Sequence, residues 1–322
     1  MRTMREERAG MSISEGISAR FANMGFVSVC LVVLMHVHCP WEGGGISQLA
    51  VPFFFAMSGY FLASHVEEKG WYVRALSKRI RTLLVPLFAW CVIWMLFTIP
   101  IALMLNVRAG RDLFANILTG WAMLRYLALD ITRTPALGPL WYVRGLIFFV
   151  IVSPAIVWLI RRTGFFVLIV LGGVYYTYAT MGTNVSFLSY GFSLQGIFYF
   201  SVGLFLRMKQ VSLNLGLMIG APVFCIGLLA YCMGWTELSI VLMIVGLWGL
   251  MPTRRFPRFL VANTFPVYLM HMFILLLFGS GKIASPSLAI GVGIIVVVVS
   301  VAVAEAIRRF APSLSVILWG GR

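Results

Sequence analysis

Residues 163–206 read TGFFVLIVLGGVYYTYATMGTNVSFLSYGFSLQGIFYFSVGLFL and contain no Asp, Glu, Lys or Arg. A helix that crosses the hydrocarbon core of a bilayer needs about 20 mostly apolar residues. This stretch of 44 residues is therefore long enough for two such helices, with the turn-like sequence MGTN at 181–184 between them. The pattern predicts a pair of transmembrane helices.

The composition of the whole chain agrees with this interpretation. Of the 322 residues, 61% are apolar and only 11% are charged, and the mean hydropathy is +0.97. Soluble domains contain about 45–50% apolar and about 25% charged residues. A soluble domain, a coiled coil and a disordered chain are therefore excluded. The five cysteines show no C-x-x-C spacing, so we expect neither a metal site nor a disulfide framework.

The intervals without charged residues predict an all-α, polytopic integral membrane protein with ten transmembrane helices. The predicted helices lie near residues 22–40, 47–65, 83–105, 139–160, 164–181, 187–206, 212–232, 236–252, 259–279 and 286–307.

The basic residues orient these helices. With the N-terminus in the cytoplasm, nineteen Lys and Arg residues fall in cytoplasmic segments and five fall in outer segments, while Arg144 lies within a helix. This bias follows the positive-inside rule, so both termini are predicted to be cytoplasmic. The net charge of +15 then reports topology, and we expect no nucleic-acid partner.

Residues 1–322 are predicted to form a single transmembrane domain, in which 1–20 are a cytoplasmic tail. The longest segment outside the membrane is a loop at 106–138 on the outer side. Its apolar residues approximate a helical stripe, which indicates an interfacial helix. Such a helix either lies at the headgroups or covers a site.

Three ionisable residues within the predicted spans are candidates for function: His36, Arg144 and His271. An Arg at the centre of a membrane helix costs roughly 2.5–3.5 kcal/mol, which makes such residues functional candidates by default. All three are predicted in the outer half of the membrane. Histidine suits a general base, and arginine suits an anion or a developing oxyanion. The alternatives are hydrogen bonds between helices for the histidines and an interfacial anchor for Arg144.

At these residues the sequence resembles the membrane-bound acyltransferase-3 family of bacterial O-acyltransferases. The matching segments, in order, are LVVLMH at 31–36, VPFFFAMSGYFL at 51–62, KRIRTLLVPLFAW at 78–90, GPLWYVR at 138–144 and FPVYLMH at 265–271. The family's ten-helix topology agrees with the number of helices predicted from hydropathy and charge.

The resemblance implies an enzyme that moves an acyl group, usually acetyl, from cytoplasmic acyl-CoA to a hydroxyl of a cell-envelope carbohydrate or lipid-linked glycan. His36 matches the catalytic histidine of the family, and Arg144 and His271 would position the acceptor or stabilise charge. The protein would lie in the bacterial inner membrane, among membrane lipids, with polysaccharide-assembly proteins as possible partners and no metal cofactor.

The donor would bind on the cytoplasmic side. Lys78, Arg79 and Arg81 lie where CoA phosphates would arrive, although the positive-inside bias alone would also place them there. Ser58 would line the acyl route or allow close helix packing. The family commonly has an Arg eleven residues before the histidine, where this chain has Gly25. Arg20 is the nearest basic residue. Either Arg20, Arg79 or Arg81 replaces the missing Arg, or this protein handles the donor differently, or it is inactive.

Two other functions remain open on the sequence alone. A transporter or flippase of a lipid-linked sugar would move its substrate without covalent chemistry. A non-catalytic member of a polysaccharide-assembly complex would do neither. The spans contain no buried Asp or Glu, which disfavours ordinary proton- or sodium-coupled transport.

Overall fold

A computed structural model describes residues 4–37, 45–104, 123–125, 127–181, 187–277 and 285–321. Within these ranges all regular secondary structure is helical and no strand occurs, which confirms the predicted all-α class. Six helices there are long and apolar enough to cross a membrane, and four further apolar helices have 10–17 residues. An apolar helix thus lies at each of the ten predicted positions. The ten-span topology and the orientation of the termini stay predictions.

Contacts along the chain divide it into two compact units, and each is described by itself. Unit 1 consists of Met1–Met57 and Gln210–Ala306, and unit 2 consists of Ser58–Lys209 and Ile307–Arg322.

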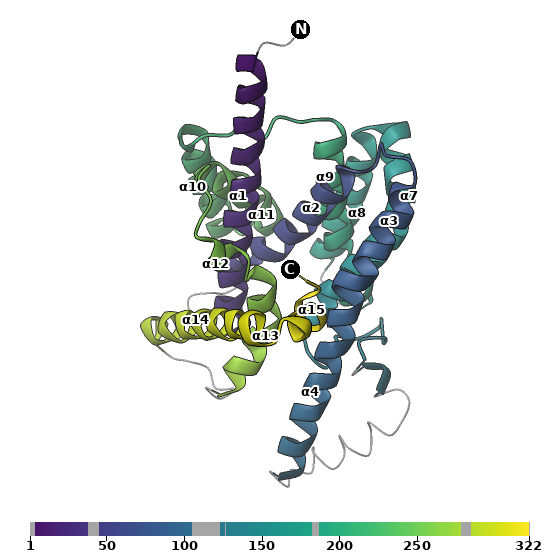
Figure 1. Ribbon diagram of the computed structural model, residues 1–322. Helices are drawn as coiled ribbons and strands as arrows, with labels where there is room; N and C mark the ends of the chain where they lie inside the picture. Colours follow the sequence, from purple (N-terminus) through teal and green to yellow (C-terminus); the bar gives the residue numbers. More distant parts are fainter. Residues whose placement is uncertain are drawn as a thin grey trace. The chain divides into compact units, whose positions relative to one another are not determined.

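Unit 1 is built around the long helix α1, which contacts α11, α12 and α13. In Figure 1, α14 crosses α1, and Gly293 of α14 lies against Leu34 of α1. The elements of this unit are α1 (Met4–His36), η1 (Ile46–Leu49), the first part of α2 (Ala50–Ala63), α10 (Leu217–Cys232), α11 (Thr236–Leu250), α12 (Arg258–Val261), α13 (Thr264–Leu277) and most of α14 (Pro286–Phe310).

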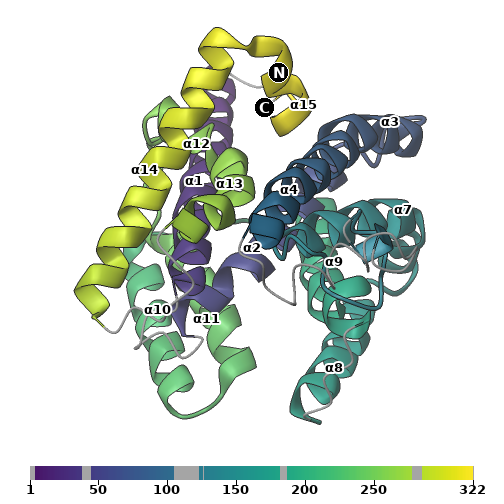
Figure 2. The ribbon, with the colours of Figure 1, turned by 90° about the horizontal axis from the view of Figure 1, so that it is seen from below.

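Helices α10 and α11 form a tight hairpin, and they lie side by side in Figures 1 and 2. Glycines face each other where the helices cross. A Cβ atom added to Gly249 would lie only 2.6 Å from the Cα atom of Gly220. Small residues at such a crossing let two backbones approach, which is how helices in lipid gain packing contacts.

Unit 2 is built around α7, which contacts α3, α4, α8 and α9. The C-terminal helix packs on α4, where the Trp90 indole N–H donates to the Leu318 carbonyl at 3.0 Å. The elements are the end of α2, α3 (Trp71–Arg79), η2 (Ile80–Leu84), α4 (Val85–Met104), α7 (Leu140–Thr163), α8 (Phe166–Thr180), η3 (Phe187–Gly191), α9 (Leu194–Met208) and α15 (Pro312–Trp319).

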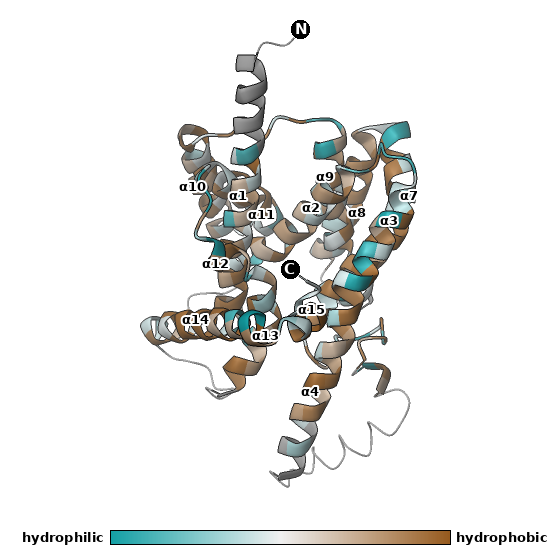
Figure 3. Ribbon diagram, in the orientation of Figure 1, coloured by the Kyte–Doolittle hydropathy of each residue, from teal (hydrophilic) through white to brown (hydrophobic). Residues whose placement is uncertain are grey.

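The third predicted helix begins earlier than hydropathy indicated. We predicted residues 83–105, but α3, η2 and α4 continue one another from Trp71. The basic residues of α3 ended the apolar run, and Figure 3 shows the hydrophilic turns of α3 in teal. Lys and Arg are nevertheless good helix formers. The left-handed backbone of Gly70, with φ of 70°, marks where the helix begins.

Other differences lie at the ends of the chain. Helix α1 already begins at Met4, within the segment predicted as a tail. Helix α15 was not predicted, because eight residues are too few to register as a span. The interfacial helix predicted within 106–138 falls largely on residues outside those the structure describes, apart from a short turn at 123–125.

Candidate functional site

Two of the predicted site residues, His36 and His271, lie next to each other in unit 1. His36 is the last residue of α1, and His271 lies in the middle of α13. Their ring centroids are 4.9 Å apart, with an angle of 62° between the ring planes. His271 is completely buried, and His36 is half-buried. The sequence predicted a similar depth for both, and the fold of unit 1 adds their contact.

Hydrogen bonds to the backbone orient both rings. His36 Nδ1 lies 2.9 Å from the Val32 carbonyl, and His271 Nδ1 lies 2.6 Å from the Tyr268 carbonyl. A carbonyl oxygen can only accept, so each Nδ1 must carry the proton that it donates. In a neutral ring Nε2 then carries the lone pair. His271 Nε2 is buried and has no hydrogen-bond partner among the described residues. In each neutral ring Nε2 is therefore the basic nitrogen.

A cavity of about 620 Å³ lies beside the middle of α1, at residues 15–20, also within unit 1. Arg20 lines it together with Arg255, and its guanidinium donates to the Leu215 carbonyl. Sixteen residues separate Arg20 from His36, which is about 24 Å along an α-helix. The cavity is also lined by Glu15, Gly16, Ile17, Ser18, Ala19, Leu213, Asn214 and Thr253. Its two guanidinium groups suit a phosphate-bearing ligand.

Gly25 lies between Arg20 and His36 in the sequence of α1, and it is buried. The family commonly has an Arg at this position. A Cβ atom there would meet Thr264, Met57 and Phe54 at 3.9–4.0 Å. These are ordinary contacts with mostly apolar atoms. A methyl group fits at this position, but its surroundings offer a guanidinium little polar compensation.

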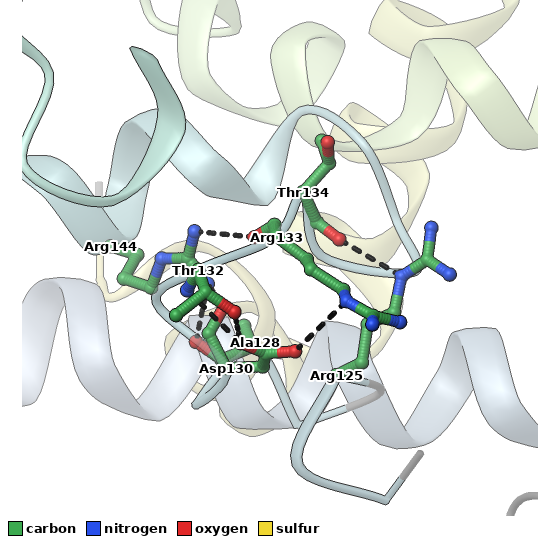
Figure 4. A network of polar contacts seen from close by, with 7 residues as sticks. All are labelled: Arg125, Ala128, Asp130, Thr132, Arg133, Thr134 and Arg144. Carbon is green, nitrogen blue, oxygen red and sulfur yellow. Dashed lines mark hydrogen bonds and ion pairs between the residues drawn. The ribbon is translucent and has the colours of Figure 1, made fainter. Parts of the chain in front are cut away.

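Arg144 lies in unit 2, and its guanidinium is committed to the backbone (Figure 4). Nη1 donates to the carbonyls of Ala128 at 3.1 Å and Asp130 at 2.6 Å. Nη2 donates to the carbonyls of Arg133 at 2.9 Å and Tyr190 at 3.0 Å. A guanidinium has four terminal N–H groups, so these bonds use all of them. Nε is buried without a partner among the described residues.

Arg144 therefore holds segments of the chain together through hydrogen bonds to their backbone carbonyls. Hydrogen bonds from a charged donor contribute about 1.5–3 kcal/mol each, so the loop of residues 127–137 is firmly attached to α7. Arg144 lies in unit 2 and the two histidines lie in unit 1, so the predicted grouping of the three residues stays a prediction.

Ser58 and Arg79 belong to an inner polar cluster of unit 2 that includes Tyr142. The hydroxyls of Ser58 and Tyr142 lie 3.4 Å apart, and both residues are buried. Arg79 interacts electrostatically with Tyr142. Sequence reasoning missed Tyr142, although it lies within the quoted segment GPLWYVR, because a tyrosine in a membrane helix is ordinary. Arg255 was also missed, since it was counted only as a marker of topology.

Lys78 and Arg81 line a shallow groove of about 460 Å³ on the surface of unit 2. Arg74, Ser77, Thr82 and Val73 complete it. Three cations on one helix face suit an anionic ligand, which is the role predicted for this segment. No group of three or more His, Cys, Asp or Glu side chains placed to hold a metal ion occurs within the described ranges.

These observations describe a helical membrane protein with two adjacent histidines and two cavities lined by basic residues. Comparison with protein families assigns it further: the acyltransferase domain of the acyltransferase-3 family matches residues 24–305, a range that contains His36, Arg144 and His271. The chain belongs to this family and is a multi-pass membrane acyltransferase. Neither the comparison with curated proteins nor that with solved structures found a match.

Proposed function

We propose that this protein is an O-acyltransferase that moves an acyl group, in the first instance acetyl, from cytoplasmic acyl-CoA to a hydroxyl of a cell-envelope carbohydrate or lipid-linked glycan. It would work in the bacterial inner membrane, with ten spans and both termini in the cytoplasm. The contact between His36 and His271, with each Nδ1–H held by a carbonyl, is the observation that carries the proposal.

His36 is the general base of the proposed reaction. Its Nε2 takes the proton from the acceptor hydroxyl while the hydroxyl oxygen bonds to the thioester carbonyl carbon. The carbon–sulfur bond then breaks, and the imidazolium returns the proton to the departing CoA thiolate. The ring of His271 packs edge-on against that of His36 and is itself held by the Tyr268 carbonyl, so it fixes the position of the His36 ring.

The donor enters from the cytoplasmic side in this proposal. The cavity with Arg20 and Arg255 fits the phosphates of CoA, because guanidinium groups bind phosphate through paired hydrogen bonds. The groove with Lys78 and Arg81 on unit 2 is an alternative cationic surface for CoA. The distance of about 24 Å along α1 between Arg20 and His36 requires an elongated donor, and acyl-CoA is one. Arg79 and Ser58, beside Tyr142, would line the acyl route.

The test uses the full chain in liposomes with radiolabelled acetyl-CoA and glycans extracted from the cell envelope. Acetyl transfer to glycan and release of CoA thiol are measured together. Loss of a general base typically costs about 10²–10⁴-fold in rate, so His36→Ala should lose that much. His65→Ala is the control, because His65 is exposed and pairs with Glu68 at the surface of unit 2.

Equal turnover by the His36→Ala protein would remove His36 from the mechanism. A flippase of a lipid-linked sugar, the other function considered, would move glycan between leaflets and leave acetyl-CoA intact. Membership of an acyltransferase family favours acetyl transfer over movement of the glycan between leaflets.

A further inference from the structure

The loop of residues 127–137 is closed on itself. Arg125 donates through Nε to the Thr134 carbonyl at 3.1 Å, and the Ala136 N–H donates back to the Arg125 carbonyl at 3.3 Å. The Asp130 carboxylate accepts from both the N–H and the hydroxyl of Thr132. Figure 4 shows the contact of Arg125 with Thr134 and that of Asp130 with Thr132. The loop therefore has a defined shape of its own.

Arg144 fixes this loop to α7 and, through the Tyr190 carbonyl, to η3. Arg144 is only 8% exposed, and its four terminal N–H groups are occupied by carbonyl oxygens. A substrate anion or oxyanion would have to displace these bonds in order to reach them. The guanidinium therefore suits the holding of protein segments better than direct contact with a reacting group.

The segments held by Arg144 present an aromatic pair. Trp141 lies three residues before Arg144 in α7, and its ring meets that of Tyr190 with centroids 5.7 Å apart and an angle of 78°. Both rings are partly exposed. The neighbouring loop adds the exposed side chain of Arg133, 4.0 Å from Asp130. Rings with one apolar face and a polar tip suit ligands of mixed character.

A carbohydrate ring is such a ligand, because its C–H face is apolar and its rim carries hydroxyls. The apolar face packs on an aromatic ring, and charged side chains and hydroxyl groups bind the rim. The loop is also predicted to face the outer side, where a cell-envelope glycan would be.

We propose that Trp141 and Tyr190 form a binding surface for a sugar ring of the acceptor, and that Arg144 is a positioning residue that holds Tyr190 and the loop of residues 127–137 in place around it. This inference rests on the proposed function for the identity of the acceptor. It assigns Arg144 to acceptor positioning and removes it from direct contact with the reacting atoms.

The test of the binding surface compares two tryptophans of the same helix. Trp141→Leu should raise the KM for extracted glycan about tenfold, the equivalent of one stacking contact, and leave the KM for acetyl-CoA unchanged. Trp158→Leu is the matched control, because Trp158 lies in α7 and is 58% exposed. It should change neither constant. An equal effect of the two substitutions, or an effect of Trp141→Leu on the donor alone, would refute the surface.

The test of the positioning role uses Arg144→Lys, which keeps the charge but cannot reach four carbonyls in one plane. Amide hydrogen exchange of residues 127–137 should become faster, and the KM for glycan should rise while kcat is kept. Unchanged exchange would refute the attachment, and a fall in kcat at constant KM would assign Arg144 to the chemistry instead. Size-exclusion profiles identify any variant that does not fold.

These measurements separate this inference from the proposed function. Binding of the extracted glycan can be measured directly by equilibrium dialysis, and this measurement requires no acyl transfer. If the wild-type protein binds glycan but transfers no acetyl, the proposed reaction fails while the surface stands. If it transfers acetyl and Trp141→Leu binds glycan as the wild type does, the surface fails alone.

Discussion

Gly59 provides the sharpest prediction about packing within unit 2. It lies in α2, next to the buried Ser58, and faces the backbone of α9. A Cβ atom at this position would lie 2.0 Å from the Phe200 carbonyl oxygen and 3.1 Å from the Leu204 amide nitrogen. Ordinary contacts begin at 3.4 Å, so α2 and α9 would have to separate by more than 1 Å. Both obstacles are backbone atoms, which no change of rotamer can remove.

The expected cost of Gly59→Ala follows from two opposing effects. Overpacking of a well-packed interior costs about 1–3 kcal/mol, and a backbone obstacle places this site in the upper half of that range. Replacing Gly by Ala in a helix returns about 1 kcal/mol. The net loss of unfolding free energy is therefore about 1–2 kcal/mol.

The matched control is Gly173→Ala in α8, because a Cβ atom at Gly173 meets nothing within 4 Å. It gains the helix propensity without the clash, so the two variants should differ by about 2–3 kcal/mol. At roughly 2 °C per kcal/mol for a chain of this size, Gly59→Ala should melt at least about 4 °C below Gly173→Ala.

The difference in melting temperature is measured by heating both variants in the same detergent and recording the loss of the monodisperse size-exclusion peak. The hydrogen bond between Ser58 and Tyr142 should be lost with the shift of α2, so acyl transfer should fall as well. Equal melting temperatures for the two variants would show that α2 and α9 do not pack as described.

Two further predictions concern single hydrogen bonds. The hydroxyl and the N–H of Thr132, with the nearby Arg133 and Arg144, hold the pKa of Asp130 below its ordinary value. This carboxylate therefore stabilises the fold above about pH 4, and the contribution is lost as pH falls through the lowered pKa. Thr132→Val should raise that pKa and reduce the loss of stability between pH 5 and pH 3 in acid-unfolding curves, and curves identical to the wild type would contradict this. Trp90→Phe removes the donor to the Leu318 carbonyl and should cost about 0.5–1.5 kcal/mol, with faster amide exchange in α15; unchanged exchange there would argue against this anchor.

Local properties of the sequence determined the class of the protein and the positions of its helices. Hydropathy and charge are carried by each segment alone, so ten apolar helices and the family assignment could be predicted without a fold. The same reasoning set the start of the third helix too late, since Lys and Arg end an apolar run without ending a helix.

Only the tertiary structure decided which side chains meet. His36 and His271 are far apart in the sequence, and equal depth in the membrane does not bring two helices together; the packing of α13 on α1 does. The sequence placed Arg144 in a span but gave none of its partners, and in the fold four carbonyls from a loop and from η3 surround it. Contacts between distant segments depend on the helix faces that pack together, and no single segment encodes that choice.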